Sequence, residues 1–181
     1  MIDSTKLLGT IITNDLKWYQ NTAHIVKKAD SRIELLRRVA GFGTSEEDLK
    51  NIYFLFVRSQ LEQSAVVWHS FLTEDNKNDL ERVQKSALKI ILGNRYKSYQ
   101  QALSELDIET LDNRRENRCI RFARKCVKNE KTARMFPLKE KTHAMQTRKT
   151  EKYEVIKANT DRLKDFALIY MQNLLNKHED Q

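Results

Sequence analysis

Apolar residues recur every three or four positions along most of the chain, with polar residues between them, which is the pattern of amphipathic helices. Few helix breakers interrupt it, since the 181 residues include four Gly and one Pro. The pattern predicts helices over residues 18–41, 44–71, 73–93, 98–106, 110–129 and 160–177. The apolar residues of the second helix spread around much of its circumference, so we expect it to lie centrally in a helical bundle.

The start of the chain has a different pattern. Leucine, isoleucine and threonine dominate residues 7–13, which predicts a short β-strand, and the turn-forming pair Asn14-Asp15 closes it. A lone strand cannot satisfy its backbone hydrogen-bonding groups, so this one needs a partner that the pattern does not identify. The predicted fold class is therefore mainly α: a helical bundle with a short N-terminal β-strand or hairpin and a C-terminal helical tail.

Polar residues mark where the helices begin. Thr44 as N-cap and Glu47 three residues later form the pattern of a capping box. We predict further N-caps at Thr73, at Ser98 with Gln101, and at Thr110. Glycines mark helix ends, with a left-handed cap expected at Gly41-Phe42-Gly43 and a stop at Gly93. These signals, and the break at Phe136-Pro137, divide the chain into a β segment (1–15), a helical bundle (16–130) and a linker with a last amphipathic helix (131–181).

The net charge of +8 is unevenly distributed. Residues 1–81 hold ten Lys/Arg against twelve Asp/Glu, or −2; residues 82–128 hold twelve against five, or +7; residues 129–181 hold eleven against eight, or +3. A positive centre of this kind favours binding to a polyanion.

The fifth predicted helix carries most of this charge. Five of its cations follow a 4-3-4-3 spacing, which keeps them within about 80° around the helix axis and extends over about 21 Å. They are Arg114, Arg118, Arg121, Lys125 and Lys128. We expect Cys119, Phe122, Ala123 and Cys126 to cover the opposite, packed side. Exposed helix faces are usually charged, but they normally mix signs, and this stripe contains no acid.

We therefore predict that the stripe contacts the phosphates of nucleic acid without reading bases. Cations of the third helix and the segment after it extend the predicted site. They are Arg82, Lys85 and Lys89, with Arg95 and Lys97 beyond them.

Other chemistry has weak support in the sequence. The four histidines are scattered and lack the paired spacing of zinc ligands, and His178-Glu179-Asp180 at the C-terminus is a poor candidate for an iron site. No phosphate-binding glycine loop is present. We expect no metal, cofactor or small-molecule substrate. The longest uncharged run, residues 63–73, is too short to span a bilayer, so we expect an intracellular protein of the nucleus or cytoplasm that is neither secreted nor membrane-bound.

Several segments together resemble the C-terminal part of non-LTR retrotransposon reverse transcriptases. The residues that carry the resemblance are Lys6-Leu7-Leu8-Gly9, Leu16, Trp18, Leu35, Arg37, Arg38, Val57–His69 (VRSQLEQSAVVWH), Leu80–Gly93 (LERVQKSALKIILG), Leu111, Arg114, Arg115, Arg148, Tyr153, Thr160, Arg162, Leu163, Tyr170, Gln172, Leu174, Leu175 and Asn176. The resemblance covers nearly the whole chain. It departs from the family at Ser59, Val66 and Ile169, which are usually Pro, and at Gln63, which is usually Tyr.

The resemblance implies that the N-terminal strand is the end of a polymerase palm and that the helices are the thumb that grips template and primer. The palm itself and its Tyr/Phe-x-Asp-Asp motif are missing, because the chain contains no Asp-Asp pair. We therefore expect a non-catalytic fragment of an RNA-directed DNA polymerase that binds RNA, DNA or their hybrid.

Two alternatives remain at this stage. The chain could be a helical protein–protein interaction module with no nucleic-acid role, whose partner is another protein such as a palm supplied in trans; the unpaired strand favours this hypothesis. The chain could also be a degenerate frame that never folds stably. Within the bundle, we predict that Arg58 and Glu62 form an internal ion pair and that Trp68 is buried in the core.

Overall fold

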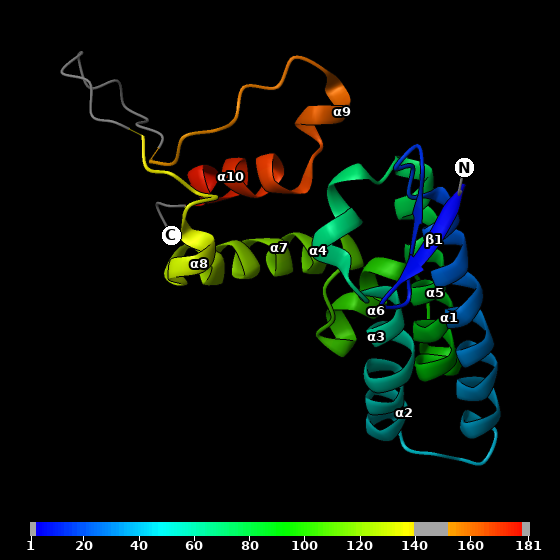
Figure 1. Ribbon diagram of the computed structural model, residues 1–181. Coiled ribbons are helices and arrows are strands. Elements are labelled where there is room, and N and C mark those ends of the chain that lie inside the picture. Colours follow the sequence, from blue (N-terminus) through cyan, green and yellow to red (C-terminus); the bar gives the residue numbers. More distant parts are fainter. Residues whose placement is uncertain (1–2, 140–151, 179–181) are drawn as a thin grey trace. The chain divides into compact units, whose positions relative to one another are not determined.

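The computed structural model describes residues 3–139 and 152–178. The chain is mainly helical with a short antiparallel hairpin near its N-terminus (Figure 1), which confirms the predicted fold class. In chain order the elements are β1 (Ser4–Leu7), β2 (Thr10–Thr13), α1 (Tyr19–Ala40), α2 (Glu46–Ile52), the π-helix η1 (Tyr53–Arg58), α3 (Ser59–Leu61), α4 (Ala65–Trp68), the 3-10 helix η2 (His69–Phe71), α5 (Glu74–Leu92), the 3-10 helix η3 (Gly93–Arg95), α6 (Tyr99–Leu106), α7 (Leu111–Lys128), α8 (Glu130–Ala133), α9 (Asp161–Lys164) and α10 (Ala167–Lys177).

The single strand predicted over residues 7–13 is wrong: the chain reverses within it. β1 pairs antiparallel with β2, with Ser4 opposite Thr13 and Leu7 opposite Thr10. The turn residues Leu8 and Gly9 both have positive φ, at 48° and 84°, which is the backbone of a two-residue hairpin turn. The pattern hid the turn because Leu8 is apolar, although it is 88% exposed.

The hairpin turn lies against the middle of the chain. The side-chain amide of Gln63 donates to the Leu8 carbonyl oxygen at 3.2 Å. The φ of +84° favours glycine at position 9, and a Cβ added there would lie 2.5 Å from the Gln63 amide nitrogen and displace this side chain. Gln63, one of the departures from the reverse-transcriptase pattern, thus holds the hairpin.

Most predicted helix starts are confirmed. The hydroxyl of Thr73 accepts from the Asn76 amide, and that of Ser98 accepts from the Gln101 amide. Thr44 is an exception, since the N-cap of α2 is Ser45, whose hydroxyl accepts from the Asp48 amide. Thr44 instead donates to the Val39 carbonyl at the end of α1. The left-handed residue after α1 is likewise Gly43 (φ +77°), whereas Gly41 is right-handed.

The continuous helix predicted over residues 44–71 is broken. α2 passes into the π-helix η1 and α3, and the chain then turns at Ser64, whose φ is +54°. The helix predicted over 160–177 is also divided, into α9 and α10, with Phe166 as the extended N-cap of α10. Both breaks occur without proline or glycine, so the sequence pattern did not indicate them.

The chain divides into two compact units. Unit 1 comprises residues 1–64 and 72–115, and unit 2 comprises residues 65–71 and 116–181. This division differs from the predicted boundaries at 15 and 130, because the segment 65–71 packs against α10 and the second boundary falls inside α7.

Unit 1 is built around α1 and α5, which lie side by side in Figure 1 and contact each other extensively. Leu36 of α1 and Leu80 and Leu88 of α5 are fully buried there. Trp18, at the start of α1, is also buried in this unit.

Unit 2 has its own core between α7 and α10 (Figure 1). Buried residues of this cluster include Cys119, Cys126, Phe136, Tyr153, Leu174 and Leu175. Trp68 of α4 also belongs to unit 2 and is fully buried, which confirms the prediction that it is a core residue.

Tail residues that carried the family resemblance hold unit 2 together. The side-chain amide of Asn176 accepts from the backbone N–H of Tyr153 at 2.9 Å and donates to its carbonyl at 3.0 Å. Gln172, fully buried, accepts from the Ile156 amide and donates to the Met135 carbonyl. Two side chains of α10 therefore fix the two chain segments that precede it.

Candidate nucleic-acid interface

The basic helix α7 forms where the sequence predicts it. The Thr110 hydroxyl accepts from the Asn113 amide at 3.3 Å, and the helix runs from Leu111 to Lys128. Its first residues, up to Arg115, belong to unit 1, and the residues from Glu116 onward belong to unit 2. The predicted site residues on α7 therefore fall into two groups: Arg114 belongs to unit 1, and Arg118, Arg121, Lys125 and Lys128 belong to unit 2.

The packed side of α7 in unit 2 differs from the prediction at one residue. Cys119, Ala123 and Cys126 are buried as expected, but Phe122 is 44% exposed and Ile120 is buried instead. The expectation that Phe122 covers the packed side is wrong: Phe122 lies on the flank of that side next to Arg118 and is exposed, and the buried residue on the opposite flank is Ile120.

Four predicted phosphate-binding residues are exposed on α7 within unit 2. They are Arg118, Arg121, Lys125 and Lys128. Sequence reasoning missed a fifth exposed cation, Arg124, because its position lies outside the 4-3-4-3 spacing. We call Arg118, Arg121, Arg124, Lys125 and Lys128 the cationic face.

Local contacts orient parts of this face. The Arg124 guanidinium donates to the His178 carbonyl at 3.1 Å, where it complements the carbonyl-rich end of α10. The Arg121 guanidinium donates to the Asn117 carbonyl one turn earlier, at 3.4 Å.

No acid opposes the cationic face on its own helix. The one acid of α7 within unit 2 is Glu116, and its carboxylate lies 3.9 Å from the Lys177 ammonium and 3.7 Å from the His178 ring nitrogen. Glu116 therefore points toward α10. The face presents five positive charges within about 15 Å of helix, and each strand of a DNA duplex places a phosphate about every 3.4 Å along the helix axis.

Arg114 has a different environment, within unit 1. Its guanidinium forms a bidentate contact with Glu62, at 2.6 Å from Nε to Oε1 and 3.4 Å from Nη2 to Oε2. The Glu62 side chain is 3% exposed, and this hydrogen bond raises the pKa of Arg114 above its ordinary value. The Arg114 side chain thus forms an internal ion pair and does not belong to the candidate interface.

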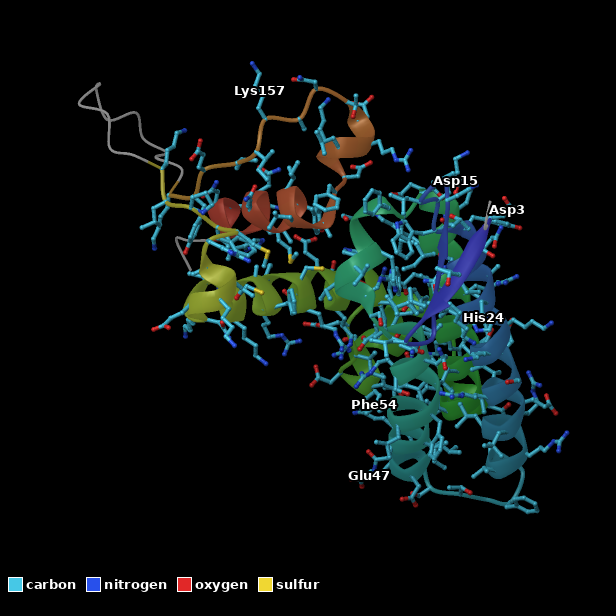
Figure 2. All side chains as sticks on the ribbon, viewed as in Figure 1. Asp3, Asp15, His24, Glu47, Phe54 and Lys157 are labelled. Atoms are coloured by element: carbon cyan, nitrogen blue, oxygen red, sulfur yellow. The ribbon has the colours of Figure 1, made fainter. Side chains whose placement is uncertain are left out.

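Arg58, predicted as the partner of Glu62, stacks on an aromatic ring. Its guanidinium carbon lies 3.7 Å from the ring centroid of Phe54. Phe54, labelled in Figure 2, also has the Lys50 ammonium 5.8 Å from its centroid.

Arg115, quoted only for the family resemblance, is fully buried in unit 1. Burial lowers the pKa of this guanidinium, and the Asp112 carboxylate lies 3.7 Å from it. A polar network continues from this turn: Glu81 accepts from the Asp112 amide and from the Tyr99 hydroxyl, and Gln84 connects Tyr99 to Tyr53. The paired arginines of the motif therefore anchor the first turn of α7 in the bundle.

The predicted site residues of α5 also belong to unit 1. Arg82 lies 3.7 Å from Asp79, the Lys85 ammonium lies 5.1 Å from the Tyr99 ring centroid, and the Lys89 ammonium lies 5.4 Å from that of Tyr96. That these three cations extend the nucleic-acid interface stays a prediction.

Among residues 3–139 and 152–178, no three or more His, Cys, Asp or Glu side chains are grouped so that they could hold a metal ion. His143, Arg148 and the pair Glu179-Asp180 lie outside the described residues. Within that same part of the chain, none of the helices combines the length and apolar character needed to cross a bilayer.

Comparison of the chain with protein-family models, with curated proteins and with solved structures found no match. The fold and the site thus define a mainly helical protein in which α7 carries a cationic surface whose one acid within unit 2 points toward α10.

Proposed function

We propose that the protein binds the sugar-phosphate backbone of nucleic acid through the cationic face of α7, in the manner of the thumb of a retroelement polymerase. The single observation that carries the proposal is the exposure of five cations on α7, whose one acid within unit 2, Glu116, is turned toward α10. We assign no catalytic step to the chain, because the sequence has no Asp-Asp pair to hold the metal ions of polymerisation.

The energetic reason is counterion release. A cation that neutralises a phosphate releases a condensed counterion, so affinity falls with salt in proportion to the number of contacts. If four of the five cations contact phosphates, log affinity falls with log salt with a slope of about −3.6 on duplex DNA and about −2.8 on a single strand.

The test is fluorescence anisotropy with labelled single-stranded RNA, single-stranded DNA, duplex DNA and an RNA–DNA hybrid, between about 50 and 200 mM KCl. We expect the variant R118E/R121E to bind at least ~50-fold more weakly at ~100 mM salt, because two phosphate contacts become repulsive. An unchanged isotherm contradicts the proposal.

A matched control is available in the same unit. Lys157, which points away from α7 in Figure 2, and Lys164 of α9 are both exposed. The variant K157E/K164E changes the net charge by the same amount as R118E/R121E. We expect it to keep nearly wild-type affinity, whereas a loss equal to that of R118E/R121E would indicate a response to net charge alone.

A second candidate function is protein binding through the hairpin. All four residues of β1 are exposed, and Leu7 and Leu8 are 60% and 88% exposed. An exposed strand edge with apolar side chains can recruit a further strand from a partner. Size-exclusion chromatography with light scattering tests self-association through this edge. We expect the variant L7K/L8K to abolish self-association. A wild-type protein that stays monomeric at high concentration argues against self-association through the hairpin.

A further inference from the structure

The cationic face has an aromatic residue at its edge. Phe122 is 44% exposed, although the packed side of α7 lies directly beside it. Its neighbours on that side, Cys119, Ala123 and Cys126, are buried in the core of unit 2. Phe122 therefore lies on the flank of α7, between its buried side and its cationic face.

The exposed neighbours of Phe122 along α7 are all cations. Arg118 lies one turn before it, Lys125 lies three residues after it, and Arg121 adjoins it along the chain. Residues three and four apart on a helix are surface neighbours, so the ring and these charges share one surface. An apolar protein partner that covered this ring would also remove water from the cations around it, which is unfavourable. A ligand with a planar apolar group flanked by anionic groups suits both the ring and the cations.

A nucleotide is such a ligand. The bases of a duplex are already stacked on one another and expose only their edges, so a surface ring can stack only on an unpaired base. Proteins that bind single strands combine a cationic track with aromatic side chains, and this stacking tolerates any base because each has a π-face.

We infer that the cationic face takes single-stranded nucleic acid, with one unpaired base stacked on Phe122 and the adjoining phosphates on Arg118, Arg121 and Lys125. This inference rests on the proposed function and makes it narrower: the preferred ligand is a strand with unpaired nucleotides, and base identity has little influence.

The test compares F122A with wild type on a labelled twelve-nucleotide oligo(dT), the same length of oligo(U), and a duplex of that length, by anisotropy over the salt range used above. We expect F122A to lose about tenfold in affinity for both single strands, to keep its duplex affinity, and to keep the salt slope, because no phosphate contact is removed. The variant F166A is the matched control, since Phe166 is 48% exposed in the same unit.

A second variant keeps the test informative if F122A disturbs the packing. F122W retains a stacking ring, so we expect it to bind single strands at least as tightly as wild type. Its new indole should lose fluorescence when oligo(dT) is added and not when the duplex is added. Equal quenching by both ligands, or equal losses of F122A on single strands and duplex, contradicts the inference.

The failure of the inference and the failure of the proposed function give different results. Unchanged single-strand affinity of F122A, with salt-dependent binding by the wild type, overturns stacking on Phe122 and leaves backbone binding in place. Absence of salt-dependent binding by the wild type to all three probes overturns both.

Discussion

Arg114 and Arg118 lie one turn apart on α7 and have different roles. The Arg114 guanidinium contacts the buried carboxylate of Glu62, whereas Arg118 is exposed in unit 2. Removal of one partner of a buried ion pair is costly because the other charge stays buried without compensation.

We expect R114A to lower the free energy of unfolding by about 3 kcal/mol and R118A to change it by less than about 0.5 kcal/mol. Urea denaturation followed by circular dichroism measures both. The double variant R114A/E62Q should recover part of the loss, because it removes the buried negative charge as well. Equal effects of R114A and R118A would show that the ion pair contributes little.

Two buried phenols predict a loss of stability at alkaline pH. Burial raises the pKa of Tyr53 well above its ordinary value, and burial together with the hydrogen bond to Glu81 raises that of Tyr99. The fold thus favours the protonated phenols. Their contribution is complete below about pH 10, the ordinary tyrosine pKa, and is lost as the pH rises above that value.

We therefore expect the free energy of unfolding to fall less steeply above about pH 10 in Y53F than in the wild type. Y19F serves as the control, since Tyr19 is 67% exposed and its replacement should leave the alkaline slope unchanged. Melting curves at a series of pH values measure the slope. A Y53F slope equal to that of the wild type would contradict the assignment.

At the scale of elements, α5 depends on a cap that the sequence already shows. The Thr73 hydroxyl accepts from the Asn76 amide at 3.3 Å. We expect T73A to cost about 1 kcal/mol and T73D to retain most of the stability, because aspartate can accept the same hydrogen bond. Chemical denaturation of the two variants measures this, and equal destabilisation would contradict a capping role.

At the break after α3, we expect a substitution that raises the stability of the fold. Ser64 has a φ of +54°, a conformation that costs side-chain-bearing residues energy and glycine almost none. We expect S64G to raise the free energy of unfolding by up to ~1 kcal/mol. The same substitution at Ser86, inside α5, should lower it. A loss of stability in S64G comparable with that in S86G would contradict strain at this turn.

These elements show which features the sequence could predict. The caps at Thr73 and Ser98 and the stop at Gly93 were predicted because each signal lies within a few residues of the boundary it sets. The Arg114–Glu62 pair was not, because its residues lie 52 positions apart in the sequence. The hairpin turn was not, because Leu8 is apolar, and the turn at Ser64 was not, because no proline or glycine marks it. The cationic face could be predicted in part. The spacing of its cations is visible in the sequence, but the contact of Arg114 with Glu62, which excludes Arg114 from the face, is a tertiary contact.

At the scale of the whole molecule, the candidate binding surface and the buried polar groups belong to different units. The cationic face, Phe122 and the cysteine-containing core belong to unit 2, whereas the ion pair of Arg114 and the buried polar network belong to unit 1. Each unit has its own buried apolar residues. Ligand binding to the cationic face should therefore stabilise unit 2 directly, by mass action on its folded state.

The residues of this chain also provide one optical or chemical probe for each unit. Trp18 is buried in unit 1, whereas Trp68 and both cysteines, which are free thiols, are buried in unit 2. In W68F, indole emission reports the opening of unit 1, while the rate of thiol modification by a disulfide reagent reports the opening of unit 2. We expect oligonucleotide to slow thiol modification and to leave the unfolding transition of Trp18 nearly unchanged, so the indole and the thiols of one variant can locate where a ligand acts.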